Sequence, residues 1–374
     1  LWHTYLTQLL VNHENAFSTA SEIRGAVEGS INHLALHDFG IFKELYDFDL
    51  AVFDSAFGTD CADFLCNYVN TGCNSKVYNQ RICDRICDMS KTLAEASTVE
   101  EFMADMVQFY KDFGVGKLGL NKAFHIEHGK DGKPVIAPIT RIAHVNLDDL
   151  VGYEIPKQKL IENTEAFVRG RKANNCLLFG DAGTGKSSSI KGILNRYYDE
   201  GLRIIEVYKH QFQDLNDVIA QIKNRNYKFI LYMDDLSFEE FEIEYKYLKA
   251  VIEGGLEKKP DNILIYATSN RRHLVREKSG DKLEVADDED LHSSDTVQEK
   301  LSLVYRFGVR IYFGAPNKKE FQNIVTTLAE RYGVTMPAEE LLMKANAWEL
   351  SHGGLTGRTA QQFIDHVLGT SEEQ

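Results

Sequence analysis

"CLLFGDAGTGKSSSIKGIL", residues 176–194, joins a short apolar run to a glycine-rich turn and then to a segment that opens a helix. The turn, Gly180–Ser187, fits the pattern G-x-x-x-x-G-K-[ST] between a buried strand and a helix. In that context glycines let backbone N–H groups point inward around a phosphate, and the helix N-terminus adds partial positive charge. A glycine turn that arose by chance would need neither the strand nor the Lys-Ser pair. The sequence therefore predicts a phosphate-binding loop of the Walker A type.

Two side chains of this loop have predicted roles toward a bound nucleotide. Lys186 would reach the β- and γ-phosphates of ATP, and the Ser187 hydroxyl would coordinate Mg²⁺. ATP and Mg²⁺ are therefore the expected cofactors. The predicted nucleotide-binding residues of the loop are Gly180, Asp181, Ala182, Gly183, Thr184, Gly185, Lys186, Ser187 and Ser188.

A second apolar strand, "FILYMDD" at 229–235, ends in two carboxylates. Asp234 lies where a Walker B carboxylate holds the Mg²⁺ shell, and it is the second predicted metal ligand. Asp235 can polarise the attacking water as a general base. Asp235 is shorter than the Glu more often found at this position, which leaves its reach to water and the hydrolysis rate open. The alternative interpretation is an Asp pair that caps a turn.

Short β-rich runs alternate with amphipathic segments around the loop. In residues 214–224, apolar residues recur at i, i+3, i+4 and i+7, which indicates a helix. Strands that alternate with helices predict a parallel sheet covered on both faces. We therefore expect an α/β fold of the P-loop NTPase class with a parallel five-stranded sheet. The strand candidates lie at 176–180, 202–208, 229–235, 262–269 and 309–314.

Helical patterns flank this region on both sides. Residues 1–115 read as mostly helical, and a Lys-Asp-Gly turn within 124–139 predicts a β-hairpin. After Pro316 only helical spacing continues. We expect three domains: a mostly helical N-terminal domain that ends in the hairpin, a nucleotide-binding domain and a helical C-terminal lid. Their predicted ranges are 1–140, 141–315 and 316–374.

Composition sets limits on the partners. The chain has 374 residues and a net charge of -14, which opposes broad contact with a nucleic-acid backbone but allows a local basic groove. The sequence contains no run of 18 apolar residues, so we expect no membrane-spanning helix. It starts at Leu1, and its first residues do not show the pattern of a secretory signal. We expect a cytoplasmic protein without a membrane partner.

Two further regions stand out in the sequence. Five of the six cysteines fall between residues 61 and 87, without the C-x₂-C pairs of common metal sites. We expect reduced, buried thiols there. A charged insertion at 277–300 predicts either a solvated loop or a loop that contacts a partner.

Four further segments resemble motifs of the AAA+ ATPases, in a resemblance that covers residues 145–370. "LDDLVGYEIPKQKLIENTEAFVRG" resembles the segment before the P-loop, which implies that Val151 and Gly152 lie against the adenine. "ATSN" resembles sensor 1, with Asn270 between the Walker B strand and the γ-phosphate. "LVYRFG" resembles the box that carries the arginine finger, Arg306, and "GLTGRTAQQF" resembles sensor 2, with Arg358 at the start of a lid helix. The resemblance implies a P-loop NTPase fold of the AAA+ type.

The resemblance also implies a catalytic set, namely Lys186, Asp235, Asn270, Arg306 and Arg358. An arginine at the far end of the sheet would reach a neighbour's P-loop more easily than its own, which predicts a head-to-tail homo-oligomer, either a ring or a helix. Each motif has a simpler alternative. Arg306 could form a structural ion pair, Arg358 could be a surface side chain, and Asn270 could cap a turn.

A closer resemblance narrows the family. "EKLSLVYRFG" and "TGRTAQQFIDHVLG" are similar to segments of a family of uncharacterised bacterial ATP-binding proteins. That family has a single AAA+ module behind a helical N-terminal region. The Asp-Asp pair is also similar to that of replication-initiator AAA+ proteins.

Three functional hypotheses follow. The first is an ATPase that hydrolyses ATP with Mg²⁺ to drive a conformational change in an unidentified macromolecular partner. The second is a nucleotide-gated scaffold with little turnover, and the third a loader-like ATPase that handles DNA, which the net charge opposes. The loop "KHQFQDL" lacks the aromatic–apolar–Gly trio of protein-threading relatives, which disfavours protein unfolding. A small-molecule kinase is disfavoured because it needs no helical lid with a "GRT" sensor.

Overall fold

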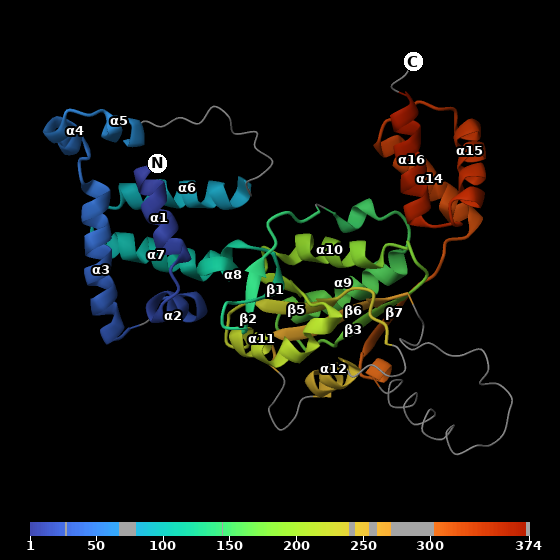
Figure 1. The fold of residues 1–374 in the computed structure, drawn as a ribbon, viewed down its shortest axis with the longest axis horizontal. Coiled ribbons are helices and arrows are strands. Elements are labelled where there is room, and N and C mark those ends of the chain that lie inside the picture. The colour runs from blue at the N-terminus through green and yellow to red at the C-terminus, as the bar shows by residue number, and fades with distance from the viewer. Residues whose placement is uncertain are drawn as a thin grey trace. The chain divides into compact units, whose positions relative to one another are not determined.

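The computed structural model describes residues 1–26, 28–66, 80–143, 145–238, 244–253, 260–270 and 303–371. The predicted insertion at 277–300 lies outside these residues. The chain divides into two compact units, Leu1–Ala123 with Ala137–Ile142 and Phe124–Ile136 with Ala143–Gln374. Figure 1 shows the elements of each unit.

The first unit is helical within the residues described, as expected. Its main core helix follows a Thr98 cap, whose hydroxyl accepts from the Glu101 N–H at 3.2 Å, and ends at Gly114, where φ is 77°. Phe102 and Met106 of that helix are fully buried. The helices are α1 (Trp2–Asn12), α2 (Ala16–Arg24), α3 (Ser30–Asp47), α4 (Ala51–Phe57), α5 (Cys61–Cys66), α6 (Gln80–Glu95), α7 (Val99–Phe113) and α8 (Gly116–Leu120).

The cysteines of this unit differ from expectation. Cys61, Cys66, Cys83 and Cys87 take part in no disulfide, but they are exposed and not buried, and Cys73 lies outside the described residues. The prediction of burial was wrong because the core of this unit is built from aromatic and aliphatic side chains of α1, α3, α6 and α7. The cysteines lie on the solvent faces of their helices.

The second unit is built on a seven-stranded sheet. Its strands are β1 (Ala123–His128), β2 (Pro134–Pro138), β3 (Cys176–Gly180), β4 (Leu202–Glu206), β5 (Lys228–Met233), β6 (Ile263–Ser269) and β7 (Val309–Phe313). The spatial order is β2-β1-β4-β5-β6-β3-β7. β3 pairs in parallel with β6 and β7, and β5 pairs in parallel with β4 and β6. The five predicted strands therefore form one parallel sheet.

The two additional strands come from the predicted hairpin. Sequence reasoning placed this hairpin at the end of the N-terminal domain, whereas β1 and β2 extend the sheet beyond β4. An uncovered β4 edge would present unpaired backbone groups, which a hairpin can satisfy. Two glutamines of the second unit add to the attachment: Gln211 donates to the Ile126 carbonyl and Gln221 to the Pro134 carbonyl, both at 2.9 Å.

Helices cover both faces of the sheet, and Figure 1 shows α10 on one side and α12 on the other. The central strands are apolar because both faces are buried, as in β6, where all seven residues are buried. The helices and 3₁₀ turns of this layer are η1 (Leu147–Asp149), α9 (Glu154–Val168), α10 (Lys186–Tyr197), η2 (Lys209–Asp214), α11 (Leu215–Ile222) and α12 (Glu244–Glu253). Among the described residues, no helix combines the length and the apolar character that crossing a membrane requires.

Three helices after the sheet form a lid with its own core. They are α14 (Lys318–Arg331), α15 (Ala338–Ser351) and α16 (Gly357–Ser371). Asn317 and Glu320 form a capping box at the start of α14, with 2.8 Å between the Asn317 N–H and the Glu320 carboxylate. Phe321, Val325 and Ile364 are fully buried between the helices.

Candidate nucleotide-binding site

The turn after β3 has the conformation that a phosphate-binding loop requires. Gly180, Gly183 and Gly185 have φ of 134°, 75° and 90°, values that other residues rarely adopt. At Gly180 a Cβ atom would collide with the Phe313 carbonyl oxygen. The Asp181 N–H donates to that same carbonyl at 3.0 Å, and the Asp181 carboxylate accepts from the Ala315 N–H at 2.7 Å. The loop is therefore anchored to the end of β7.

Lys186, the first residue of α10, lies inside this loop. Its side chain is only 6% exposed, and its Nζ donates to the carbonyl oxygens of Gly180 at 3.0 Å and Asp181 at 2.5 Å. Burial lowers the pKa of Lys186 below its ordinary value, against the opposite effect of nearby carboxylates, Asp181 first. The ammonium group therefore has backbone dipoles as hydrogen-bond partners, which leaves it suited to an anionic ligand.

Three hydroxyl groups converge on one oxygen of Asp234. Oδ1 accepts from Ser187 at 2.8 Å, from Tyr232 at 2.7 Å and from Thr268 at 2.5 Å. Partial burial on its own would raise the pKa of Asp234, but hydrogen bonds from Thr268, Tyr232 and Ser187 lower it below its ordinary value. The carboxylate is therefore ionised and fixed in orientation.

The donor set fits Mg²⁺. The Ser187 hydroxyl and the Asp234 carboxylate are hard oxygen donors 2.8 Å apart. Magnesium is commonly held by one or two protein oxygens together with phosphates and water. In the part of the chain that the structure describes, no cluster of three or more His, Cys, Asp or Glu could hold a metal ion without such help.

Asp235 and Asn270 face each other across two strand ends. Asn270 Nδ2 donates to Asp235 Oδ1 at 2.8 Å. The Asp235 backbone has a φ of 49°, unusual for a residue other than glycine, and its N–H donates to the Thr268 hydroxyl at 2.9 Å. Thr268 thus holds the side chain of one aspartate and the backbone of the next.

The lid touches the phosphate loop directly. The Arg358 N–H donates to the Gly183 carbonyl at 3.2 Å, and a Cβ on Gly183 would lie 3.2 Å from the Arg358 Cβ. At the other end of the pocket, the Arg331 guanidinium donates to the carbonyls of Asp149 at 2.8 Å and Asp148 at 3.2 Å. The lid is therefore joined to the segment before the loop and to the loop itself.

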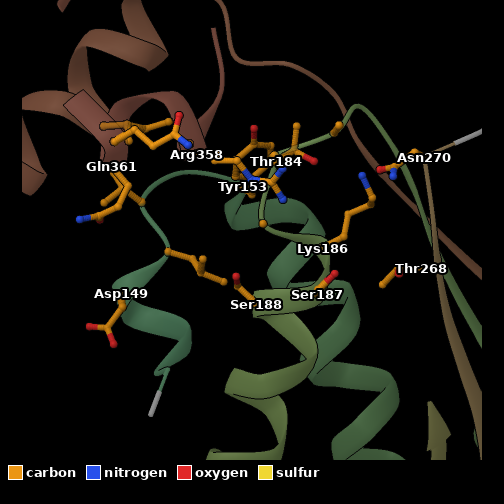
Figure 2. A pocket seen from close by; sticks show the side chains of 18 of the residues that line it. Asp149, Tyr153, Thr184, Lys186, Ser187, Ser188, Thr268, Asn270, Arg358 and Gln361 are labelled. Carbon is orange, nitrogen blue, oxygen red and sulfur yellow. The ribbon is translucent and has the colours of Figure 1, made fainter. Parts of the chain in front are cut away.

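These groups border one pocket of about 630 Å³. Figure 2 shows Lys186, Ser187, Thr268 and Asn270 on its strand side and Arg358 and Gln361 on its lid side. Its lining residues are Asp149, Leu150, Val151, Tyr153, Ala182, Gly183, Thr184, Gly185, Lys186, Ser187, Ser188, Asp234, Asp235, Thr268, Asn270, Ile324, Leu328, Gly357, Arg358, Gln361 and Gln362.

The pocket brings together most of the residues predicted from sequence. The three predicted binding residues that do not line it are Gly152, Gly180 and Asp181. Val151 does line it and packs against the lid core.

Arg306 lies away from this pocket. It precedes β7, and its guanidinium forms an ion pair with the Glu253 carboxylate at the end of α12. Its side chain is 32% exposed. A structural ion pair of this kind was the alternative interpretation of Arg306 in the sequence analysis. The role of Arg306 as an arginine finger toward a neighbouring subunit stays a prediction.

Sequence reasoning missed Tyr232, Thr268 and Tyr153. Tyr232 precedes Asp234 by two residues, and Thr268 precedes Asn270 by two, so the alternation of a strand could have placed each pair on one face. Tyr153 has no comparable signal in the sequence. Its hydroxyl donates to the Gly314 carbonyl at 3.2 Å, and burial raises its pKa to about 12, with added effects of the charges on Glu320 and Asp181.

A protein-family model matches residues 120–371, and its description is "Protein of unknown function (DUF815)". The chain belongs to this family. The predicted membership of a family without an established role is thereby confirmed. None of the curated proteins matches this sequence.

Solved structures with a similar fold include RuvB and FIGL-1. A RuvB mutant from Thermotoga maritima is 17% identical, with a TM-score of 0.44, over 62% of this chain and 66% of that chain. The FIGL-1 AAA domain in complex with ADP is 16% identical, with a TM-score of 0.42, over 62% of this chain and 75% of that one. This chain thus spans about two thirds of the RuvB structure. The sheet order, the P-loop and the lid of the present chain give it a P-loop NTPase fold of the AAA+ type.

Proposed function

We propose that this chain binds ATP with Mg²⁺ in the pocket between the phosphate loop and the lid, hydrolyses it, and uses the cycle to change the conformation of a macromolecular partner. The observation that carries the proposal is the convergence of Lys186, Ser187, Asp234 and Asn270 on that pocket, because they come from three separate strand ends. A pocket of this size fits a nucleotide-sized ligand.

The phosphate end of the site is supported by Lys186. A triphosphate in the loop would replace the carbonyls of Gly180 and Asp181 as partners of the ammonium group. It would also add negative charge beside the buried ammonium group. The N-terminus of α10 directs further N–H groups to the same place.

The metal end is supported by Ser187 and Asp234. Mg²⁺, when bound there with the nucleotide, would neutralise charge on the β- and γ-phosphates. Tyr232 and Thr268 hold the Asp234 carboxylate in place, so that it does not have to reorient on ligand binding.

Water activation is assigned to Asp235. Its carboxylate oxygen already accepts a hydrogen bond from Asn270, which orients it at the end of β5. The Asn270 amide carries two N–H groups, so it can retain Asp235 through one and donate to a γ-phosphate oxygen through the other.

The decisive experiment is Mg²⁺-dependent phosphate release from ATP. We expect Lys186→Ala and Asp235→Asn each to reduce the rate by about 100-fold or more, since each removes a charged group that acts on the transition state. Lys191→Ala, an exposed lysine in the same helix, is the matched control and should leave the rate unchanged. An unchanged rate in Lys186→Ala would overturn the proposal.

Arg306 is proposed to act on the site of a neighbouring copy in a homo-oligomer. Mixing Arg306→Ala with Lys186→Ala subunits should then restore part of the activity, because mixed interfaces pair an intact loop with an intact arginine. Glu253→Gln removes only the ion pair seen within one chain. If Glu253→Gln lowers the rate as much as Arg306→Ala and mixing restores nothing, the role of Arg306 is structural.

One observation favours a scaffold with little turnover as the second candidate. Asp235 is short, and its carboxylate is hydrogen-bonded to Asn270 at 2.8 Å. Slow single-turnover hydrolysis at protein concentrations that give oligomers would support the scaffold. Asn270→Ala should then raise the rate by releasing Asp235, whereas an active ATPase loses activity on the same change.

A further inference from the structure

The surface of the first 66 residues differs from that of the rest of the chain. Among the described residues, more than half of the large apolar side chains that face solvent lie in this segment, which is less than a fifth of the sequence. Soluble proteins seldom gather exposed apolar side chains in one region unless a partner covers them. None of these residues belongs to the nucleotide pocket.

The exposed side chains form an ordered stripe on α3. Positions 31, 34, 38, 41 and 45 follow the alternating three- and four-residue spacing of a coiled-coil seam. Four of these five positions are apolar, and Leu34 and Ile41 are 70% and 47% exposed. A neighbouring face of α3 buries Ala35, Phe39 and Tyr46 in the core of its own unit. Helix α3 is thus apolar on two faces, of which the fold covers one.

A groove of about 700 Å³ runs beside this stripe. It lies within the first unit, and α1, α2, α3 and α7 all contribute to its lining. Phe17, Phe39 and Tyr110 are among its aromatic residues, and Leu9 of α1 lies 42% exposed at its border. Along α3 the lining extends from Ile31 to Phe42, about 16 Å at the rise of a helix. That length matches about three turns of a second helix.

The segment that carries this surface is strongly negative. Residues 1–66 contain ten Asp and Glu but two Lys and Arg, a net charge of -8 out of -14 for the whole chain. Within the stripe, Asp38 occupies a seam position, and its side chain is 76% exposed. A helix packed on the stripe would have to place a positive charge opposite Asp38.

From this geometry we propose that the α3 stripe and its groove bind an amphipathic α-helix with a positively charged face, contributed by a partner protein. The spaced apolar residues would take the apolar face of that helix at i, i+3, i+4 and i+7. The acidic surroundings would select its lysines and arginines, and Asp38 would fix its register. The inference stands apart from ATP hydrolysis, because the surface shares no residue with the nucleotide pocket.

The other candidate occupants fit less well. A second copy of α3 would bring one acidic surface against another, at a cost in charge repulsion. A membrane with anionic lipids would be repelled by the same net charge. Both become outcomes of the test.

The probe is a fluorescent synthetic peptide of about five helical turns, with leucine at alternating three- and four-residue spacing and lysine elsewhere. A second peptide carries glutamate in place of lysine, and a third keeps the composition of the first with its leucines scrambled. Anisotropy with the full chain at physiological salt should show saturable binding of the first peptide alone. Leu34→Asp should weaken it by about tenfold or more.

Matched variants separate this site from general attraction to an acidic protein. Leu350→Asp changes an even more exposed leucine of the lid, 82% exposed, and should bind the lysine peptide as the wild type does. Asp38→Lys should weaken the lysine peptide and strengthen the glutamate peptide. Lys186→Ala should bind normally, so a failed ATPase proposal would not affect this one.

Four results would overturn the inference. One is no binding of the lysine peptide, and another is equal binding by wild type and Leu34→Asp. A third is a fall in the sedimenting mass of the chain on Leu34→Asp, which would make a second copy the occupant. The fourth is binding to vesicles of phosphatidylcholine and phosphatidylserine that Leu34→Asp abolishes while peptide binding persists.

Discussion

The nucleotide pocket and the α3 surface differ in whether their side chains have partners within the chain. In the pocket, polar groups are paired with one another: Asp234 accepts from three hydroxyls, and Asp235 accepts from Asn270. On α3, apolar side chains such as Leu34 face solvent without cover. The first region is complete apart from its ligand, whereas the second is complete only with a partner. Changes in the pocket should therefore alter chemistry and stability, and changes on α3 should alter recognition.

The largest difference should come from two glycines with positive φ. Alanine at Gly180 would have to hold a φ of 134° against the Phe313 carbonyl, and we expect a loss of about 3 kcal/mol or more in unfolding free energy. Alanine at Gly58, where φ is 63° and no atom lies within 4 Å of a Cβ, should cost about 1 kcal/mol. Chemical denaturation of both variants measures this. Equal losses of unfolding free energy in the two variants would contradict the prediction that the contact with the Phe313 carbonyl makes Gly180 the less tolerant position.

A smaller effect should separate two buried threonines that each contact a tyrosine. Thr268→Val removes a donor to Asp234 and an acceptor for the Asp235 N–H, and we expect hydrolysis to fall about 10–100-fold. Thr7→Val in the first unit removes a hydrogen bond of 2.8 Å to the His3 carbonyl, and should cost about 1 kcal/mol of stability without changing hydrolysis. Phosphate release and thermal unfolding of both variants are the measurements. A Thr7 variant that lost activity would contradict the comparison.

The smallest expected effect concerns alkaline pH at the edge of the pocket. Burial, with the charges of Glu320 and Asp181, raises the pKa of Tyr153 from 10.0 to about 12. The folded state therefore holds this proton more tightly, and its contribution to stability is full below pH 10 and is lost as pH rises toward about 12. We expect the unfolding free energy of wild type to decline over that window relative to Tyr153→Phe. Parallel curves for the two proteins would show that the phenol does not titrate differently on folding.

The phosphate loop and the strand ends could be predicted because their signals are local. The run at 176–180 matches β3 residue for residue, and the Asp pair follows directly on β5. Spacing within one element decides such features, since backbone geometry and burial act there over a few residues. The predicted residues that line the pocket, such as Lys186 and Asp234, were mostly identified from spacing within one such element.

What could not be predicted depends on pairing between distant segments. The hairpin at β1 and β2 was found, but the sheet edge it joins belongs to β4, which follows after more than sixty residues. The Thr268 hydroxyl at the end of β6 donates to Asp234 at the end of β5, the neighbouring strand. The sequence of β6 alone does not predict which strand pairs with it. The spacing of apolar residues in α3 predicts that both of its apolar faces are buried. The sequence of the helix does not show which of the two faces packs into the core of the fold.

The two attachments of the lid have a mechanical consequence. The Gly183 carbonyl holds the first turn of α16, and Arg331 at the end of α14 holds the carbonyls of Asp148 and Asp149. Because the three helices share one packed core, we expect a small shift of either anchor to tilt them together as one body. In such a rotation, atoms far from the two anchors would be displaced more than the atoms next to them.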